Sequence, residues 1–387
     1  MNNGNHTKGY LRLHPRAALK HLESSYVYHA ARDELYEIDV KAETFLSRCD
    51  GTLSIEECSS DSEFVEYCLE EELLEILDQP DRRAVSIDYA PNPSLRYLEL
   101  QLLHACNLKC RHCYLGPARP DVLSLDDALT IAREFALRGG LRLLISGGEP
   151  MLYPYLKDFL AETAKLNVYR VLLTNGTLIN EDTMYDCAVE NIQFSLDGWQ
   201  EGHDLLRGPG SFEKTIRGIY TARHAGIPVS IATMIHRGNI NDFERIKRFT
   251  EQIDATEWGV DVLCMAGSLT NNRDLLVPYD KAAPFMNYAY GGGNHSSSSG
   301  FACGRHLMTV LPTGMAVKCG FFENSPLGDA SSGLIRCWMN LKHIALDELE
   351  CKDCSVIDTC AGGCRFRAPH TCAPDPAMCA YYGKTCP

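Results

Sequence analysis

Short strand-like runs alternate with helical segments over residues 96–265, and this alternation limits the fold more than any other feature. The runs are rich in aliphatic and β-branched residues and lie at 96–103, 142–146, 170–174, 192–195, 228–234 and 259–265. Helical patterns separate them, for example at 213–225, at 241–253, and from Ser124 through Arg138. Six strands alternating with helices predict a parallel α/β sheet or a partial barrel.

Polar and glycine-rich segments follow the predicted strands. The segment HACNLKCRHCY (104–114) follows the first run, and GGEP (147–150), TNGT (174–177) and SLDG (195–198) follow later ones. The carboxyl ends of parallel strands meet at one edge, where such folds carry their chemistry. These segments therefore predict one shared site.

Composition excludes several classes of protein. The chain has 387 residues, 45% of them hydrophobic, and a formal charge of −14. This charge is unfavourable for a nucleic-acid-binding surface. No run of about 18 apolar residues predicts a membrane span, and the first residues lack the apolar core of a secretory signal. We expect a cytoplasmic protein that binds neither nucleic acid nor membrane.

The chain has 18 cysteines, a high number for a cytoplasmic protein. In a reducing compartment such a count indicates metal or redox chemistry rather than disulfides. The cysteines concentrate in the 104–114 segment and in residues 303–379. For the scattered ones we expect a role as small buried hydrophobes; these are Cys49, Cys58, Cys68, Cys187, Cys264 and Cys386.

The segment 104–114 holds Cys106, Cys110 and Cys113 with the spacing C-x3-C-x2-C. Three thiolates can hold three irons of a 4Fe–4S cluster. The fourth iron then has no protein ligand, and an open position is typical of metal sites that perform chemistry. The alternative is a zinc site completed by His104 or His112.

The cysteine spacing followed by Tyr114, together with SGGEP (146–150), resembles the radical S-adenosylmethionine (SAM) superfamily over about residues 96–265. The resemblance implies a 4Fe–4S cluster whose open iron binds SAM, and cleavage of SAM to a 5′-deoxyadenosyl radical. The catalytic cysteines would be the three of this segment. The glycines of the motif would permit close backbone approach to SAM, and the acidic residue would accept from its ammonium. The implied cofactor-binding residues of the two motifs are Tyr114, Gly147, Gly148, Glu149 and Pro150.

Two later segments resemble further parts of the same family. Asn175 lies in TNGT, and Ser195 and Asp197 in SLDG, where the family contacts the polar groups of SAM, including its ribose hydroxyls. Arg207 resembles the family's arginine near the SAM carboxylate. The alternative for each residue is turn chemistry or a solvated charge.

The cysteine-rich tail follows a Gly/Ser-rich stretch at 290–300, which we expect to be mobile, and begins with a predicted hairpin at 306–319. Its seven-cysteine order resembles the SPASM domain, which carries two auxiliary 4Fe–4S clusters. The resemblance implies two ligand sets: Cys351, Cys354, Cys360 and Cys379 for one cluster, and Cys303, Cys319 and Cys364 for the other.

The second set of tail cysteines has three members, so its fourth ligand is open. Cys337, Cys372 or Cys264 could complete it, or the iron could bind a substrate thiolate. The alternative for the whole tail is a pair of structural zinc knuckles.

Residues 1–85 read as a small α+β unit. A hairpin is predicted around the turn at 31–34, a short helix ends near Asp50-Gly51, SIEE (54–57) has capping-box spacing, and 62–77 reads as one helix before a linker near 80–95. The pattern resembles the RiPP recognition element, a winged-helix module that binds leader peptides of ribosomally made, post-translationally modified peptides. The alternative is an α+β extension without such a role.

Together these features predict three domains: a peptide-binding module at 1–85, a partial (β/α)6 TIM-like barrel at 96–289, and a SPASM domain at 300–387. The resemblance implies an oxidoreductase-type peptide maturase that introduces a thioether or carbon–carbon crosslink, or an oxidation. Its partners would be a precursor peptide with a leader and an electron donor such as flavodoxin or ferredoxin.

Alternative functions keep part of this chemistry. Tetrapyrrole side-chain decarboxylases and sulfatase-type maturases of the same superfamily have similar barrels. An iron–sulfur or zinc scaffold without turnover is the non-enzymatic alternative. His236 and Cys264 lie at predicted strand ends, and we expect a packed or solvated role for both.

Overall fold

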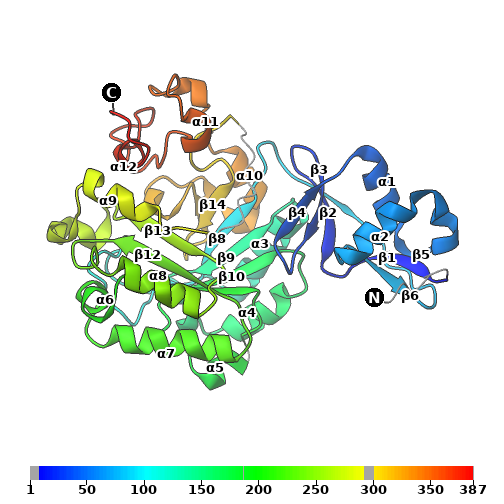
Figure 1. The fold of residues 1–387 in the computed structure, drawn as a ribbon, viewed down its shortest axis with the longest axis horizontal. Coiled ribbons are helices and arrows are strands. Elements are labelled where there is room, and N and C mark those ends of the chain that lie inside the picture. Colours follow the sequence, from blue (N-terminus) through cyan, green and yellow to red (C-terminus); the bar gives the residue numbers. More distant parts are fainter. Residues whose placement is uncertain (1–7, 186, 292–299, 387) are drawn as a thin grey trace.

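The computed structural model describes residues 8–185, 187–291 and 300–386. A nine-stranded sheet forms its centre, in the order β13-β12-β11-β10-β9-β8-β14-β15-β16 (Figure 1). Most of the stretch predicted to be mobile, residues 292–299, lies outside the described residues. The strands are β8 (Tyr97–Gln101), β9 (Arg142–Ser146), β10 (Tyr169–Thr174), β11 (Asn191–Ser195), β12 (Val229–Ile235), β13 (Trp258–Val262), β14 (Leu307–Val310), β15 (Met315–Val317) and β16 (Gly328–Asp329).

The strands β8 to β13 pair in parallel, so the predicted partial barrel is confirmed. The predicted helix at Ser124 is also confirmed, because the Ser124 side chain accepts from the N–H of Asp127 and caps the helix. The helices of this part are α3 (Leu125–Leu137), α4 (Leu156–Thr163), α5 (Glu181–Tyr185), α6 (Gln200–Arg207), α7 (Ser211–His224), α8 (Phe243–Gln252) and α9 (Tyr279–Met286).

The two faces of the parallel sheet differ in polarity. Side chains on one face are fully buried and pack in the main hydrophobic core; they include Leu98, Leu143, Leu172, Ile192 and Ile231. Alternate residues point to the other face, because side chains alternate along a strand. Glu99, Gln193 and Ser195 are only partly buried there. Toward the carboxyl ends of the strands, the inner face of the barrel is therefore polar and partly accessible.

The predicted hairpin of the tail is present, but it is not separate from the barrel. β14 and β15 pair antiparallel, and β14 also pairs in parallel with β8. The first part of the tail thus extends the barrel sheet past β8. The remaining tail is irregular and carries the helices α10 (Leu334–Met339), α11 (Ile357–Cys360) and α12 (Pro376–Tyr381).

The N-terminal unit has two small sheets, of order β5-β1-β6 and β4-β3-β2-β7, with two helices. The predicted hairpin pairs β3 with β4, and the capping box at Ser54 is present. The elements are β1 (Tyr10–Leu13), β2 (Ala17–His21), β3 (Ser25–His29), β4 (Glu34–Glu37), α1 (Val40–Arg48), β5 (Asp50–Ser54), α2 (Ser62–Glu70), β6 (Leu74–Leu77) and β7 (Ile87–Tyr89).

The single helix predicted for 62–77 is wrong in its second half. Helix α2 ends at Glu70, and Leu74–Leu77 forms strand β6. Glu72 between them has a φ of 53°, in the left-handed region, which stops the helix. The predicted linker also contains a strand, because β7 pairs with β2.

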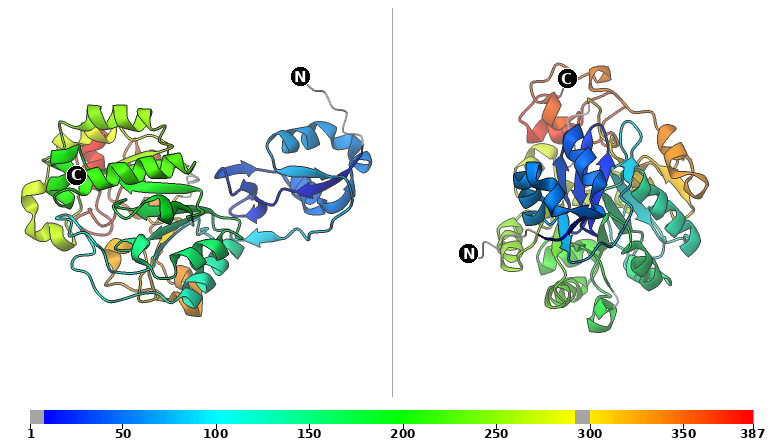
Figure 2. Two further views of the ribbon diagram at one scale, coloured as in Figure 1. Left: turned by 90° about the horizontal axis from the view of Figure 1, so that it is seen from below. Right: turned by 90° about the vertical axis from the view of Figure 1, so that its right-hand side faces the viewer.

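The N-terminal unit extends to one side of the barrel and contacts it through the sheet β4-β3-β2-β7 (Figure 2). Tyr28 and Ala30 pack in one cluster with Leu141 and Tyr169, at the start of β9 and β10. The Lys20 ammonium donates to the Gly140 carbonyl at 2.8 Å. The unit therefore covers the amino ends of the strands, opposite to the edge that carries the cysteine loop.

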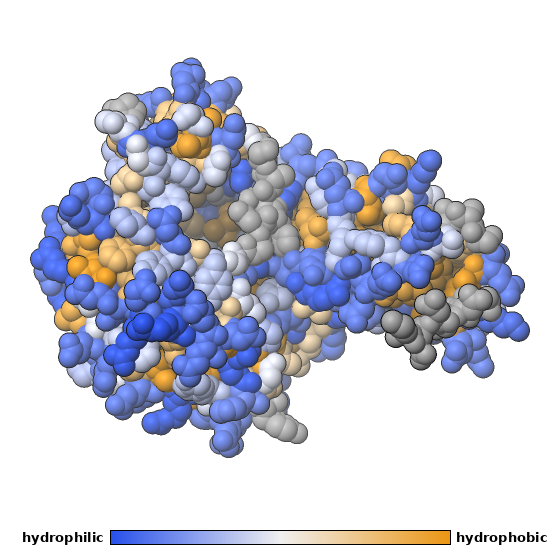
Figure 3. All heavy atoms as spheres, in the orientation of Figure 1, coloured by the Kyte–Doolittle hydropathy of each residue, from blue (hydrophilic) through white to orange (hydrophobic). Residues whose placement is uncertain are grey.

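Polar side chains cover most of the face seen in Figure 3, and apolar areas form separate patches on the barrel and on the N-terminal unit. Among the described helices, none combines the length and apolar character needed to cross a bilayer.

Candidate functional site

The cysteine loop, residues 102–123, leaves β8 and is joined to the GGEP segment at its start. The Gly148 N–H donates to the Leu103 carbonyl at 2.8 Å, and the Glu149 N–H donates to the Ala105 carbonyl at 3.0 Å. These two bonds align the ends of β8 and β9 side by side. The two predicted motifs are thus in direct contact.

The two glycines are required by this contact. A Cβ atom on Gly148 would lie 2.3 Å from the Ala105 carbonyl oxygen, and one on Gly147 would lie 2.5 Å from the Leu103 oxygen. Gly147 also has a φ of 145°, which favours glycine. In this structure the two glycines therefore allow the backbone of the cysteine loop to lie directly against the GGEP segment.

Glu149 is fully buried. Its carboxylate accepts from the Thr174 hydroxyl at 2.7 Å, the Asn175 N–H at 2.9 Å and the Met151 N–H at 3.1 Å. Burial raises its pKa, while these hydrogen bonds oppose the shift. Glu149 therefore holds the ends of β9 and β10 together, and its expected contact with the ammonium of SAM stays a prediction. Pro150 follows it as the first residue of a buried 3₁₀ turn.

Asn175 links this framework to the cysteines. Its side-chain amide donates to Asn107 Oδ1 at 2.9 Å and lies 3.9 Å from Cys106 Sγ. Thr177 donates to Asn175 Oδ1 at 2.6 Å. Because its side chain bonds within the chain, Asn175 positions Cys106 rather than presenting a free group.

Asp197 and Arg207 form a buried ion pair beside the cysteine loop. Arg207 Nε donates to Asp197 Oδ2 at 2.5 Å, and the Met234 N–H donates to Oδ1 at 2.6 Å. Burial alone would raise the pKa of Asp197, but Arg207 outweighs it and lowers the pKa to about 2. Asp197 has no exposed surface and orients Arg207, while its expected contact with the polar groups of SAM stays a prediction. Ser195, at the end of β11, remains partly exposed.

Three histidines surround this pair and were not recognised from the sequence as a group. His236 Nε2 lies 2.8 Å from the Asp197 carbonyl, and the Asp197 N–H donates to His203 Nδ1 at 3.2 Å. His112 lies close enough for its charge to affect Asp197. Burial lowers the pKa of both His112 and His203 to about 4. The imidazoles are neutral at pH 7, which leaves Arg207 as the cation of the group.

The three loop cysteines are free thiols and partly exposed, and Cys106 and Cys113 lie close enough to Cys110 to raise its pKa. Burial raises the pKa of Cys110 to about 11, and Arg207 opposes this shift. Within the described residues, no three His, Cys, Asp or Glu side chains are arranged around a single metal ion. A 4Fe–4S cluster fits this loop, because each thiolate binds a different iron.

An aromatic row leads from the cysteine loop to the tail. The rings of Tyr114 and Phe321 have centroids 4.8 Å apart, and those of Phe321 and Phe366 are 4.9 Å apart. Glu99 on the inner face accepts from Ser146 at 2.7 Å and lies 3.5 Å from the Tyr114 hydroxyl. A cavity of about 540 Å³ opens beside this row, between the cysteine loop and the tail.

The first predicted set of tail cysteines is gathered around one hollow. Cys351, Cys354, Cys360 and Cys379 line it together. A fifth thiol joins them, because Cys386 Sγ lies 2.9 Å from Cys379 Sγ. Cys386 was expected to be an isolated hydrophobe, and no local pattern indicates its partner seven residues away.

The second set also converges. Cys303 and Cys319 both lie close enough to Cys364 for that thiol to contribute to raising their pKa values. Of the three proposed additions, Cys264 lies close enough to Cys364 for that thiol to raise its pKa. Cys337 instead packs against Gly328, and the Cys372 carbonyl accepts from the Glu350 N–H.

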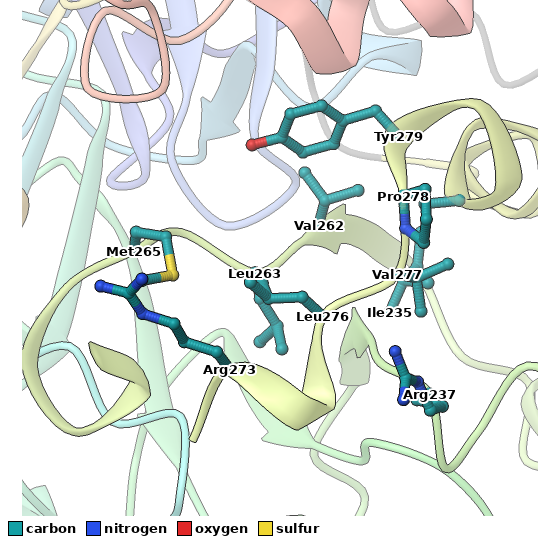
Figure 4. Close-up of a pocket in the computed structure, with 11 residues that line it drawn as sticks. Ile235, Arg237, Val262, Leu263, Met265, Arg273, Leu276, Val277, Pro278 and Tyr279 are labelled. Carbon is teal, nitrogen blue, oxygen red and sulfur yellow. The ribbon is translucent and has the colours of Figure 1, made fainter. Parts of the chain in front are cut away.

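A second cavity, of about 420 Å³, lies near the carboxyl ends of β12 and β13 (Figure 4). Its strand residues Ile235 and Val262 belong to the buried face that packs under helices. Figure 4 shows Arg237 and Arg273 on opposite sides of apolar side chains. This cavity therefore lies behind the inner face of the barrel.

A family model described as the Radical SAM superfamily matches residues 100–250. The AdoMet-dependent heme synthase of Nitratidesulfovibrio vulgaris is 29% identical over 208 residues, which cover 51% of this chain and 56% of that protein. The sporulation killing factor maturation protein SkfB of Bacillus subtilis is 29% identical over 174 residues, covering 43% and 42%. The chain thus spans about half the length of these curated relatives.

Among solved structures, Streptococcus suis SuiB bound to precursor peptide SuiA matches with a TM-score of 0.69 and 14% identity. The match covers 95% of this chain and 99% of SuiB, so the fold is shared over nearly the whole chain. The family model spans the cysteine loop, GGEP, Asn175, Asp197 and Arg207. Radical SAM proteins use a 4Fe–4S cluster and SAM, and the free thiols of the loop suit that cluster. Residues 100–250 of this chain therefore form a domain that matches the radical SAM superfamily.

Proposed function

We propose that this radical SAM enzyme modifies a ribosomally made precursor peptide, forming a thioether or carbon–carbon crosslink or an oxidised residue. The observation that carries the proposal is the combination of the cysteine loop with an N-terminal α+β unit and a cysteine-rich tail in one fold that SuiB shares. SuiB was solved with a precursor peptide bound. Peptide modification by this chain follows as an inference from that likeness.

The chain's own residues would prepare the reaction. A 4Fe–4S cluster and SAM supply a 5′-deoxyadenosyl radical when bound. Cys106, Cys110 and Cys113 would hold the cluster, and Arg207, fixed by Asp197, would pair with the SAM carboxylate. Ser195, partly exposed at the end of β11, would bond to a polar group of SAM.

The substrate would enter from the tail side. The cavity of about 540 Å³ is bordered by the cysteine loop from Tyr114 to Arg119 and by tail residues such as Phe321 and Phe366. The tail cysteines would hold two auxiliary clusters, which would supply an electron acceptor for the substrate radical. A flavodoxin or ferredoxin would be the electron donor of the enzyme. The aromatic row described above lies between the two cysteine regions.

The leader of the precursor would add a strand to β4, at the edge of the sheet β4-β3-β2-β7. The Ile38 N–H donates to the Ser25 carbonyl at 3.0 Å. Because backbone donors alternate along a strand, the N–H of Glu37 points away from β3, toward the free edge. Glu37 is exposed, so a proline there removes an outward donor without a large loss of packing.

A binding experiment tests the peptide role. The probe is a fluorescein-labelled synthetic peptide encoded by the short reading frame adjacent to this gene. Glu37→Pro should weaken its binding at least tenfold, whereas Glu37→Ala, which keeps the N–H, should bind like the unmodified enzyme. Equal affinities for all three proteins would contradict strand addition at β4. Mass spectrometry of the same peptide after anaerobic turnover should show the modification.

A tetrapyrrole decarboxylase is the second candidate, because the AdoMet-dependent heme synthase relative has 29% identity. That function predicts the loss of the mass of carbon dioxide from a propionate-bearing tetrapyrrole during anaerobic turnover. The peptide proposal predicts no such loss. Running both substrates with one enzyme preparation decides between the two candidates.

A further inference from the structure

The sheet of the partial barrel does not close on itself, because β13 ends it on one side and β16 on the other. β13 is the terminal strand at one end, while the tail hairpin of β14 and β15 extends the other end beyond β8. Cys264 follows β13 by two residues. Cys303 precedes β14, and Cys319 follows β15 by two residues. Cysteines from both ends of the sheet are thus available to one site.

The tail returns from the β14 side to β13. Arg367 Nη1 lies 2.7 Å from Asp261 Oδ1 in β13, and Arg367 Nη2 lies 2.9 Å from Asp375 Oδ2. Asp375 also accepts from the Cys364 N–H at 2.8 Å. The Arg367 and Asp375 side chains are 6% and 0% exposed, so this half of the link is desolvated, whereas Asp261 is 51% exposed.

The ion pair between Arg367 and Asp261 brings two cysteines together. Each cysteine lies three residues along the chain from one member of the pair. Cys264 lies three residues after Asp261, and Cys364 lies three residues before Arg367. The side chains of Cys264 and Cys303 both lie close enough to Cys364 to interact with its thiol. Helix α12 of the tail packs against α9, which contacts β13, and this supports the same approach.

We propose that Cys264 is the fourth ligand of the auxiliary cluster held by Cys303, Cys319 and Cys364. The cluster then has four cysteine ligands and joins the two ends of the open barrel. It has no open iron for a substrate thiolate. This inference rests on the auxiliary clusters of the proposed function. Cys337 is the matched control, because it is an equally buried cysteine whose contacts lie at Gly328.

The test uses the full chain with Cys106, Cys110 and Cys113 replaced by alanine, so that only auxiliary clusters remain. This background should hold about eight irons per chain, as two four-iron clusters. Cys264→Ala should lower the iron toward about four, or keep it while 2-mercaptoethanol shifts the EPR signal of the reduced cluster. Cys337→Ala should match the background in both measurements.

Cys264→Ser covers the case in which the alanine variant fails to fold, because serine keeps the shape of the side chain. Its EPR g-values should differ from those of the background if an oxygen replaces a sulfur ligand. Iron content and g-values equal to the background in the serine variant would overturn the inference. If the triple-alanine background binds no iron, both the Cys264 assignment and the auxiliary clusters are wrong. If the background holds about eight irons and the Cys264 variants match it, only the Cys264 assignment is wrong.

Discussion

Arg207 Nε donates to Asp197 Oδ2 at 2.5 Å, in a pair that is almost completely removed from water beside the cysteine loop. The same guanidinium opposes the rise that burial causes in the pKa of the Cys110 thiol, and so favours the thiolate that binds iron. The Asp197 carboxylate thus fixes the position of the Arg207 guanidinium. This cation acts on the cysteine loop and, as we propose, also pairs with the SAM carboxylate.

Asp197→Asn should destabilise the fold and weaken SAM binding. The substitution leaves the Arg207 charge buried without its partner, which costs about 3–5 kcal/mol in typical proteins. Asp274→Asn is the matched control, because Asp274 pairs with Arg111 at 2.8 Å but is 62% exposed. It should change the free energy of unfolding by less than about 1 kcal/mol. Similar losses in both variants, measured by thermal unfolding, would contradict this role of Asp197.

The stability should fall as the pH is lowered from about 7 toward 5, partly because of His203. Burial lowers its pKa to about 4 in the fold, whereas an exposed histidine has a pKa of about 6.5. The stabilisation is therefore complete above about pH 6.5 and is lost as the pH falls toward 4, with a slope of up to about 1.4 kcal/mol per pH unit.

His203→Gln should reduce that slope in thermal unfolding followed by circular dichroism. His224→Gln, at an exposed position, serves as the control and should leave the profile unchanged. A profile of equal slope in the His203 variant would show that this imidazole does not become charged on unfolding in this pH range.

Gly148→Ala should displace the cysteine loop. The added methyl group would lie 2.3 Å from the Ala105 carbonyl oxygen, a contact that the backbone must relieve by moving. We expect a loss of about one third of the bound iron, since one of three clusters depends on the loop. Gly259→Ala adds a methyl group whose nearest neighbour is 3.9 Å away, and it should retain its iron. Normal iron content in the Gly148 variant would refute the steric argument.

Arg142→Met should loosen the N-terminal unit from the barrel. Arg142 pairs with Asp33 of that unit and, at 2.7 Å, with Glu257 of the barrel, and its side chain is only 11% exposed. Limited proteolysis should then cut the segment near residues 80–95 several times faster. Arg133→Met removes a largely exposed pair with Glu162 and should leave the cleavage rate unchanged.

Much of the fold could be predicted because it depends on local patterns. The apolar runs of the six parallel strands and the cap at Ser124 are readable within a few residues. The end of helix α2 was not, because Leu73 and Ile76 continue the helical spacing and Glu72, without a glycine or proline, adopts a positive φ. The pairing of β14 with β8 joins segments about 210 residues apart, which no local pattern encodes.

In the candidate site, too, the features set by local patterns could be predicted, and those set by distant segments could not. The cysteine spacing identified the cysteine loop, and the glycine motif identified the GGEP segment beside it. Both could be found because their functional residues are close together in the sequence. The burial of Glu149 and Asp197 depends on donors from other strands, such as Thr174 and the Met234 N–H. A polar residue at a strand end has the same sequence pattern whether it meets a ligand or the protein itself.

The most direct test of the central claim is the anaerobic incubation of the iron-loaded chain with SAM and dithionite, with 5′-deoxyadenosine quantified by liquid chromatography. The account predicts 5′-deoxyadenosine from the unmodified chain and none from the Cys110→Ala variant. The absence of 5′-deoxyadenosine from a chain that carries its full iron, or equal amounts from both proteins, would contradict it.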